Sequence, residues 1–211
     1  MSQLRVLASV CFLCLLAVGV IGAIAVVGRA APDFAAKDIG GQEILLSSYR
    51  GKIVVLEWTN ANCPYVKKQY SKETNGGSGN MQTMQRQFTQ PSVGVIWLMI
   101  DSSSPGTSGY TGAEGWKSIL SSWGAHPTAL IVDDSGDIAK LYGASRTPEV
   151  FVIGKNGALL YRGAVDSLRG TDPAEIDRAS NLPWLKHAVE NAVRERRVIP
   201  PETIPYGCPI K

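Results

Sequence analysis

Cys63 occupies a position where a thiol can act as a nucleophile. An apolar run over residues 53–58 predicts a buried strand just before it, and Glu57 alone interrupts that run. The asparagines before the cysteine suit a tight loop and a helix cap, and Pro64 suits the first position of a helix. Unpaired N–H groups and the helix dipole favour the thiolate there, which is the reactive species. Cys63 is therefore predicted to be a redox or nucleophilic cysteine; the plainer alternative is a small buried apolar residue.

The N-terminal segment predicts export. Residues 6–27 are uncharged and rich in apolar side chains, which is typical of a secretion signal or a single membrane anchor. Small residues at 23–25 and 28–30 fit cleavage, whereas the length of the run also fits an anchor. Either interpretation places residues 31–211 outside the cytoplasm, in a periplasmic or other extracytoplasmic location.

The sequence divides into three parts. Residues 1–30 form the signal peptide or anchor, residues 31–197 have the length of one folded domain, and residues 198–211 form a proline-rich tail. Without the first part, which carries two of the four cysteines, Cys63 and Cys208 remain as an even pair in an oxidising compartment.

The tail can bring Cys208 to Cys63. Four prolines within residues 200–209 keep it extended, so it can reach roughly 30 Å beyond the last helix. That distance crosses a small domain, to Cys63 of the same chain or of a second subunit. Gly207 would allow a close backbone approach, and Tyr206 could anchor the tail by packing.

Charge and histidine content exclude other functions. A formal net charge of +3, spread along the chain, predicts no nucleic-acid partner. His126 and His187 lack ligand spacing to a cysteine, so neither a metal site nor another cofactor is expected. Lys67 and Lys68 are expected to lie on a solvated helix face.

The order of predicted elements favours a mixed α/β sheet with helices on both faces. The expected strands are a hairpin within residues 32–46, then 53–58, 93–100 and 128–132, and a second hairpin of 150–153 and 159–165 joined by an Asn-Gly turn. The expected helices are 64–72, one from residue 81, 113–123, 138–142 and 182–197.

Several motifs resemble the peroxiredoxin-like AhpC/TSA (redoxin) group of the thioredoxin-fold superfamily. They are Ala31–Phe34, Trp58–Asn60, Cys63–Lys67, Thr147–Phe151, Leu160–Gly163 and Tyr206–Lys211. The resemblance implies a thioredoxin-like fold with a C-terminal extended tail. It also implies that the bond between Thr147 and Pro148 is cis and lies beside the reactive cysteine.

The chain departs from the patterns of related enzymes. Val66 stands where a disulfide reductase of this fold has its second cysteine, so dithiol exchange within the motif is impossible. A typical peroxidase has a hydroxyl residue three positions before its cysteine; here that residue is Asn60, and Thr59 is one position away. Arg146 and Arg162 are candidates for contact with an anion or a peroxide, and Arg146 is better placed because it is close to Pro148.

The sequence therefore predicts an exported, thiol-dependent oxidoreductase. Cys63 would attack a hydroperoxide or a disulfide, and Cys208 or an external thiol would resolve the product. The candidate site residues are Cys63, Cys208, Thr59, Asn60, Thr147, Pro148 and Arg146. The expected partner is an external thiol reductant or a disulfide partner, with possible membrane attachment through residues 6–27. The alternative is a non-enzymatic binding or redox-sensing module in which Cys63 and Cys208 form a structural disulfide.

Overall fold

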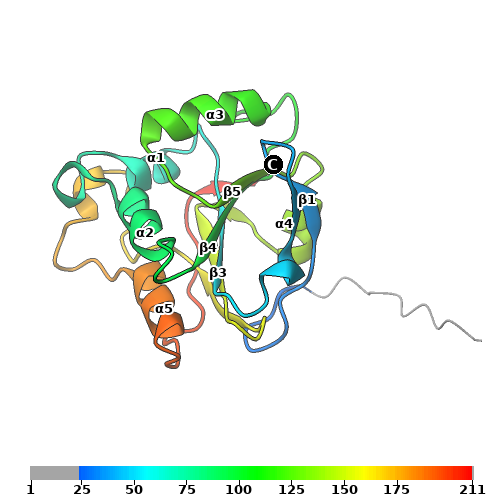
Figure 1. The fold of residues 1–211 in the computed structure, drawn as a ribbon. Coiled ribbons are helices and arrows are strands. Elements are labelled where there is room, and N and C mark those ends of the chain that lie inside the picture. The colour runs from blue at the N-terminus through cyan, green and yellow to red at the C-terminus, as the bar shows by residue number, and fades with distance from the viewer. Residues whose placement is uncertain (1–23, 211) are drawn as a thin grey trace, which may run out of the picture.

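A five-stranded mixed sheet forms the centre of the molecule (Figure 1). The computed structural model describes residues 24–210. The strands lie in the order β5 (Ala129–Val132), β4 (Ile96–Asp101), β3 (Val54–Trp58), β7 (Glu149–Ile153) and β8 (Leu159–Gly163). The first three are parallel to one another, whereas β7 and β8 are antiparallel to their neighbours, which confirms the predicted mixed sheet.

Helices and a small hairpin cover the two faces of this sheet. One apolar cluster packs under α1 (Pro64–Tyr70), α2 (Asn80–Phe88), α3 (Gly112–Trp123) and α5 (Trp184–Val193). The other packs under α4 (Asp137–Tyr142) and the hairpin of β1 (Ala35–Lys37) and β2 (Glu43–Leu45). Three 3₁₀ turns, Leu46–Tyr49, Asn75–Gly77 and Pro173–Glu175, lie in the connections.

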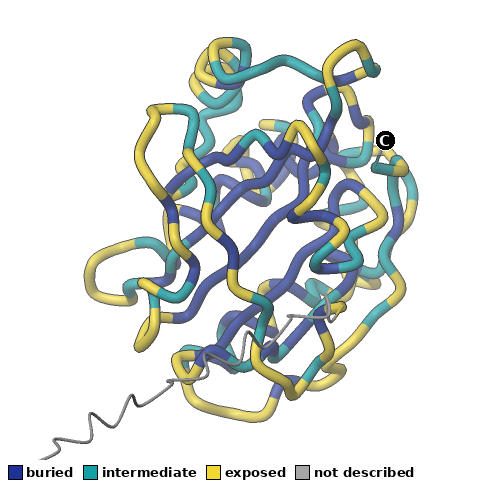
Figure 2. Tube along the Cα trace, turned by 90° about the vertical axis from the view of Figure 1, so that its right-hand side faces the viewer, coloured by how far each residue is buried: buried dark blue, intermediate teal, exposed yellow. Residues whose placement is uncertain are grey.

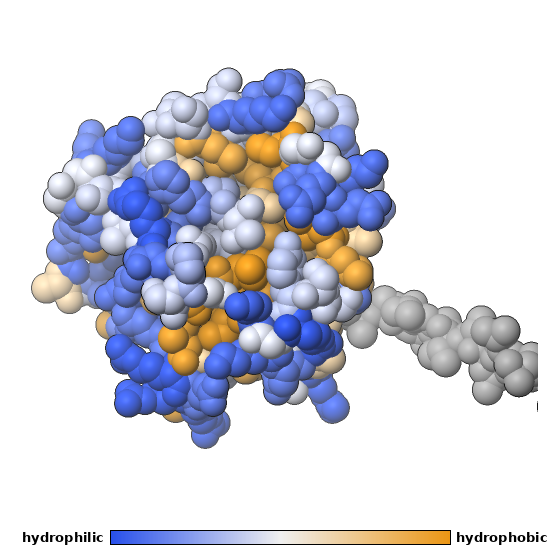
Figure 3. Space-filling view, in the orientation of Figure 1, coloured by the Kyte–Doolittle hydropathy of each residue, from blue (hydrophilic) through white to orange (hydrophobic). Residues whose placement is uncertain are grey.

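Burial on both faces explains the composition of the central strands. All residues of β3 and β7 are buried, as expected for strands that have helices or a hairpin on either side. Figure 2 shows these strands as a dark buried centre surrounded by exposed loops. In Figure 3, hydrophilic residues cover most of the face seen in Figure 1, and apolar residues gather in the recesses between them.

Element boundaries differ from the sequence-based ones where turns intervene. β4 begins at Ile96 rather than at residue 93, because Gly94 has a φ of 70° and its N–H donates to the Gln90 carbonyl in a turn. α5 ends at Val193 because Glu195 adopts a φ of 54°, which a helix cannot accommodate.

The described N-terminal residues pack against the sheet. Ala25 is buried in the second apolar cluster, the N–H of Gly28 donates to the Leu159 carbonyl, and that of Ala31 donates to the Gly157 carbonyl. The domain contacts therefore begin several residues before residue 31. The remainder of the apolar segment and the Cys11–Cys14 pair lie outside the described residues. Within residues 24–210, no helix has both the length and the apolar character needed to cross a bilayer.

The proline-rich tail runs back across the molecule from α5. It is extended, and the N–H of Arg162 donates to the Pro201 carbonyl. Its end forms a two-residue strand, β9 (Cys208–Pro209), that pairs antiparallel with β6 (Arg146–Thr147). Pairing with β6 is a contact that the proline content alone does not reveal.

Candidate active site

The loop between β3 and α1 positions Cys63. Cys63 is the N-cap residue of α1, and Pro64 occupies the first helical position. The Cys63 carbonyl accepts from the N–H of Lys67 at 2.9 Å. Cys63 is 1% exposed. β3 and β4 are parallel and end in register, with Trp58 opposite Ile100, so the loops that follow them share one edge of the sheet. Ligand sites in α/β sheets commonly form at this edge.

The Thr147–Pro148 segment lies directly against Cys63. The bond between these two residues is cis, as the family resemblance implies. The Cys63 thiol donates to the Thr147 carbonyl oxygen, at a distance of 3.0 Å. The expected juxtaposition of Cys63 with residue 147 is therefore present.

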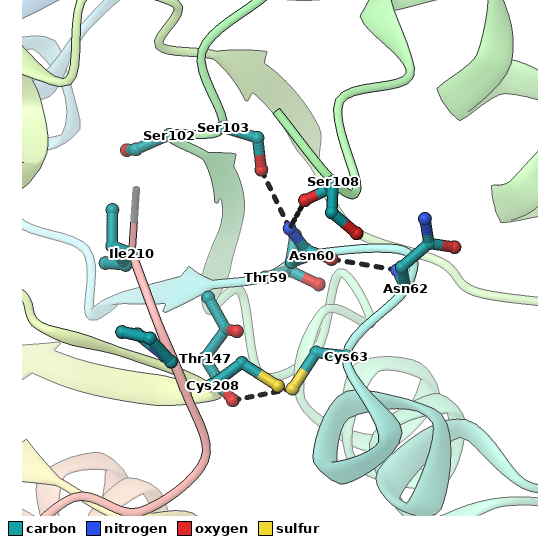
Figure 4. Close-up of a pocket in the computed structure, with 11 residues that line it drawn as sticks. Thr59, Asn60, Asn62, Cys63, Ser102, Ser103, Ser108, Thr147, Cys208 and Ile210 are labelled. Carbon is teal, nitrogen blue, oxygen red and sulfur yellow. Dashed lines mark hydrogen bonds between the residues drawn. The ribbon is translucent and has the colours of Figure 1, made fainter. Parts of the chain in front are cut away.

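The tail brings Cys208 to the same place. Cys208 is the register partner of Thr147 in the β6–β9 pair, and Figure 4 shows the Cys63 and Cys208 sulfurs directed toward each other. Gly207 has a φ of 122°, and a Cβ atom on it would overlap the Thr147 carbonyl oxygen. Only glycine fits this approach, so residue 207 sets how closely the tail docks.

Tyr206 anchors the tail by packing and by hydrogen bonding. Its hydroxyl donates to Asp166 Oδ1 at 2.6 Å and accepts from Gln69 Nε2 at 3.3 Å. Its ring packs edge-on against Tyr65, with 5.9 Å between centroids. Burial, followed by the charge of Asp166, raises the pKa of Tyr206 far above its ordinary value, so this hydroxyl remains a donor.

Lys68 belongs to this anchor rather than to a solvated face, which corrects the sequence-based expectation. Its side chain is fully buried, and Nζ lies 3.4 Å from Glu175 Oε2 and 3.8 Å from Asp166 Oδ1. Nζ also donates to the Leu168 carbonyl and lies 5.1 Å from the centroid of the Tyr206 ring. The loop of residues 166–175 supplies these partners, and no local sequence pattern predicts that it folds over α1.

A hollow of about 240 Å³ opens beside the Cys63 sulfur. Its lining contains five predicted site residues together with side chains that sequence reasoning missed (Figure 4). The lining residues are Thr59, Asn60, Asn62, Cys63, Ser102, Ser103, Ser108, Thr147, Cys208, Pro209 and Ile210. The signal for the missed serines was the polar run after β4, at the edge where β3 also ends.

Neither arginine candidate reaches this hollow. Arg146 is exposed because side chains alternate along a strand, and β6 buries Thr147 instead. Arg162 is part-buried elsewhere: its guanidinium lies 3.5 Å from Glu149 and from Glu202 and donates to the Ala25 carbonyl at 3.0 Å. We therefore correct the expectation that Arg146 or Arg162 contacts a bound anion at Cys63.

Glu57, the charged residue within β3, is completely buried. Oε1 accepts from the Tyr70 hydroxyl at 2.8 Å, and Oε2 accepts from Trp97 Nε1 at 2.7 Å. Burial outweighs these hydrogen bonds and raises the pKa of Glu57 to about 7. The side chain is thus a buried acid that titrates near neutrality.

Comparison with known proteins identifies the family. The profile of the AhpC/TSA family matches residues 27–162, which is more than half of the chain. The chain belongs to the AhpC/TSA family. The match includes Cys63 and the Thr147–Pro148 segment but ends before the tail that carries Cys208. No curated protein matches significantly.

Solved structures confirm the thioredoxin-like fold of this AhpC/TSA protein. An uncharacterized conserved protein from Geobacillus kaustophilus has a TM-score of 0.72 at 21% identity, over 89% of this chain and 93% of that one. A hypothetical protein from Sinorhizobium meliloti has a TM-score of 0.70 at 20% identity, over 90% and 96%. A putative thiol:disulfide interchange protein DsbE from Chlorobium tepidum has a TM-score of 0.56 at 21% identity, over 80% and 99%.

Proposed function

We propose that this protein is a thiol oxidoreductase that uses two cysteines. Cys63 attacks the substrate, and Cys208 resolves the intermediate. The position of Cys208 carries the proposal. Cys208 pairs with Thr147, and the Thr147 carbonyl accepts from the Cys63 thiol, so both cysteines lie at the same residue. Membership of the AhpC/TSA family and the DsbE-like neighbour agree with thiol chemistry of this kind.

Either oxidant would convert the two thiols into a Cys63–Cys208 disulfide. With a hydroperoxide, the Cys63 sulfur attacks the terminal oxygen, the O–O bond breaks, and Cys63 becomes a sulfenic acid as the alcohol leaves. Cys208 then attacks that sulfur, which releases water and forms a disulfide. With a disulfide substrate, Cys63 forms a mixed disulfide and releases one substrate thiol, and attack by Cys208 releases the other. An external thiol reductant returns both cysteines to thiols.

Peptide mapping tests the roles of the two cysteines. After one equivalent of oxidant, the reduced full-length protein should contain a Cys63–Cys208 disulfide. Cys208→Ser should stop at an oxidised Cys63 that a sulfenic-acid probe or a mixed disulfide reveals, and Cys63→Ser should consume no oxidant. A Cys63–Cys208 bond that resists reductant, on a protein inert to both oxidants, would instead support a structural disulfide. Full turnover by Cys208→Ser would remove the tail from the mechanism.

Export is the second part of the proposal. The apolar residues 6–27 support it, as either a cleaved leader or a retained anchor. Fractionation of cells that produce the full chain tests this, because export predicts recovery outside the cytoplasm. The apparent mass of the recovered protein distinguishes a cleaved leader from an anchor.

A further inference from the structure

Exposed cations gather at the end of the molecule opposite Cys63. The turn between β7 and β8 lies at that end, because Ile153 pairs with Val54 at the start of β3, whereas Cys63 follows the end of β3. Figure 1 shows this turn at the bottom of the view and α1 and α3 at the top. We call the set of exposed basic residues on and around the turn the basic end: Arg29, Arg50, Lys52, Lys155 and Arg196.

Contacts with the turn place these residues on one surface. The Arg50 side chain and the N–H of Gly51 both donate to backbone carbonyls of the turn. Lys155 and Arg196 line one hollow, of about 380 Å³, between the turn and the end of α5. Arg50 and Lys52 line a second, smaller hollow on the other side of the turn. The cations therefore lie on both sides of a single protruding hairpin.

Little negative charge offsets the basic end. Glu195 pairs with Lys155 at 2.6 Å, and Asp33, which lies beside Arg50, accepts from the N–H of Ser47 at 2.9 Å. The other four cations form no ion pair within the described residues. A surface with this excess of positive charge complements an anionic partner.

A short connection joins the basic end to the apolar N-terminal run. Ala30 pairs with the hairpin that carries the turn. Only three residues separate Ala30 from the end of the uncharged run of residues 6–27, and they span at most about 11 Å. Ile24 and Val26, near the end of this run, are 58% and 55% exposed. Whatever holds the run must therefore lie close to the basic end.

A lipid bilayer fits both features. The run of residues 6–27 is 22 residues long, which is enough to cross a hydrocarbon core of about 30 Å. The headgroups beside it would lie next to the basic end, and anionic headgroups attract exposed lysine and arginine side chains over a screening length of about 8–10 Å. A soluble polyanion or an acidic protein would use the cations but leave the apolar run without a partner.

We propose that the basic end rests on a bilayer that contains anionic phospholipids and holds residues 6–27. This inference goes beyond the proposed thiol chemistry and rests on the anchor form of the proposed export. Cleavage after Ala30 would remove the backbone bonds that Gly28 and Arg29 form with Leu159, which is an argument for a retained segment. In this orientation Cys63 lies at the end away from the bilayer, where oxidant and reductant reach it from the aqueous phase.

Acylation of lysines in the full chain tests this orientation. The chain is inserted into preformed vesicles of phosphatidylcholine, with or without phosphatidylglycerol, and treated with a membrane-impermeant amine-acylating reagent. Lys155 and Lys117 are matched, because their side chains are 51% and 50% exposed and each pairs with a glutamate at 2.6 Å. In anionic vesicles Lys155 should react about fivefold more slowly than Lys117, which lies on α3, and in neutral vesicles the two should react alike. Peptide mass spectrometry measures both rates.

Charge variants test the cause of the protection. Lys52→Gln with Arg196→Gln removes two cations that form no ion pair within the described chain, and it should lower the docking equilibrium on anionic vesicles about thirtyfold. Acylation of Lys155 should then recover, as it should in about 0.5 M salt. Lys67→Gln with Lys72→Gln makes the same change of charge on α1, at the other end of the molecule, and should leave the protection intact.

Several results would overturn the docking. Equal acylation of Lys155 and Lys117 in anionic vesicles would do so, as would protection of Lys155 that persists in neutral vesicles or in the variant at residues 52 and 196. Protection by inorganic phosphate in detergent solution, without vesicles, would assign the cations to a free anion. If alkaline carbonate strips the chain from the vesicles, the anchor form of export fails as well. If the chain resists carbonate but Lys155 is unprotected, the docking alone fails.

Discussion

Glu57 makes the stability of the protein depend on pH near neutrality. Its pKa is about 7 in the folded state, above the ordinary value of 4.5, because burial disfavours the carboxylate. The folded state therefore binds this proton more tightly than the unfolded state does. The resulting stabilisation is complete below about pH 4.5 and is lost as the pH rises through about 7.

We expect Glu57→Gln to flatten this dependence. In the native protein, the raised pKa of Glu57 should lower the free energy of unfolding by about 3 kcal/mol as the pH rises from 4.5 to 7. Glutamine stays neutral and can still accept from the Tyr70 hydroxyl, so this decline should disappear. Urea unfolding at several pH values measures it, and the exposed Glu114→Gln is the matched control. An equally steep decline in the Glu57 variant would contradict the assignment.

Gly207 governs the approach of the tail to the candidate active site. Alanine there would place a methyl group on the Thr147 carbonyl oxygen, so Gly207→Ala should prevent β9 from pairing with β6. We expect at least a tenfold slower formation of the Cys63–Cys208 disulfide after a pulse of oxidant, while the initial oxidation of Cys63 persists. Mass spectrometry of quenched samples measures both steps.

Gly124→Ala is the control for this change. Gly124 also has a positive φ, of 64°, but a Cβ atom on it meets nothing within 4 Å. It should therefore lower stability without slowing the disulfide step. Equal rates for the Gly207 and Gly124 variants would show that close approach at residue 207 is unnecessary.

At the scale of elements, the sequence predicts the strands and helices better than their contacts. The apolar runs of β3 and β7 and the Asn-Gly turn after β7 are local signals, so these elements are predictable. The cysteine at the start of α1 and the Thr-Pro before β7 were likewise visible in the residues. The burial of Lys68 and the contacts of Arg162 away from the hollow depend on segments far away in the sequence. No local pattern specifies these contacts.

The tail is the element for which this distinction matters most. Its extended form followed from proline content, whereas its docking depends on Tyr206 and the buried Asp166. Tyr206→Phe removes a hydrogen bond to a carboxylate, worth about 2 kcal/mol, and leaves Asp166 without that donor. Amide hydrogen exchange near residues 206–210 should therefore become faster by tenfold or more, and disulfide formation should slow in parallel.

Tyr142→Phe provides the comparison for the tail. Tyr142 donates to the Pro32 carbonyl at 2.7 Å on the opposite side of the sheet. Loss of this hydrogen bond should lower the global free energy of unfolding. Amide hydrogen exchange in the tail should then become faster only by the factor that this global loss of stability produces. If the two phenylalanine variants affect the tail alike, Tyr206 is not its specific anchor.

At the scale of the whole molecule, the N-terminal residues complete the fold. Ala25 is buried, and Gly28, Arg29 and Ala31 exchange backbone hydrogen bonds with the β7–β8 hairpin. A chain that begins at residue 31 should be less stable than one that begins at residue 24, by about 2 kcal/mol for the lost bonds and burial. Thermal unfolding of the two truncated proteins compares them. Equal midpoints would mean that residues 24–30 contribute nothing to the fold.

The position of Cys208 also has a consequence for biosynthesis. About 145 residues separate it from Cys63, so at 5–20 residues per second the ribosome needs roughly 7–30 s to make the intervening chain. If Cys208 resolves Cys63 as proposed, the nascent polypeptide carries Cys63 without its resolving thiol throughout that interval. Chains that end prematurely, or that lose their last few residues to a protease, would keep Cys63 without Cys208 permanently. We expect such chains to accumulate as disulfide-linked dimers or as adducts with small thiols.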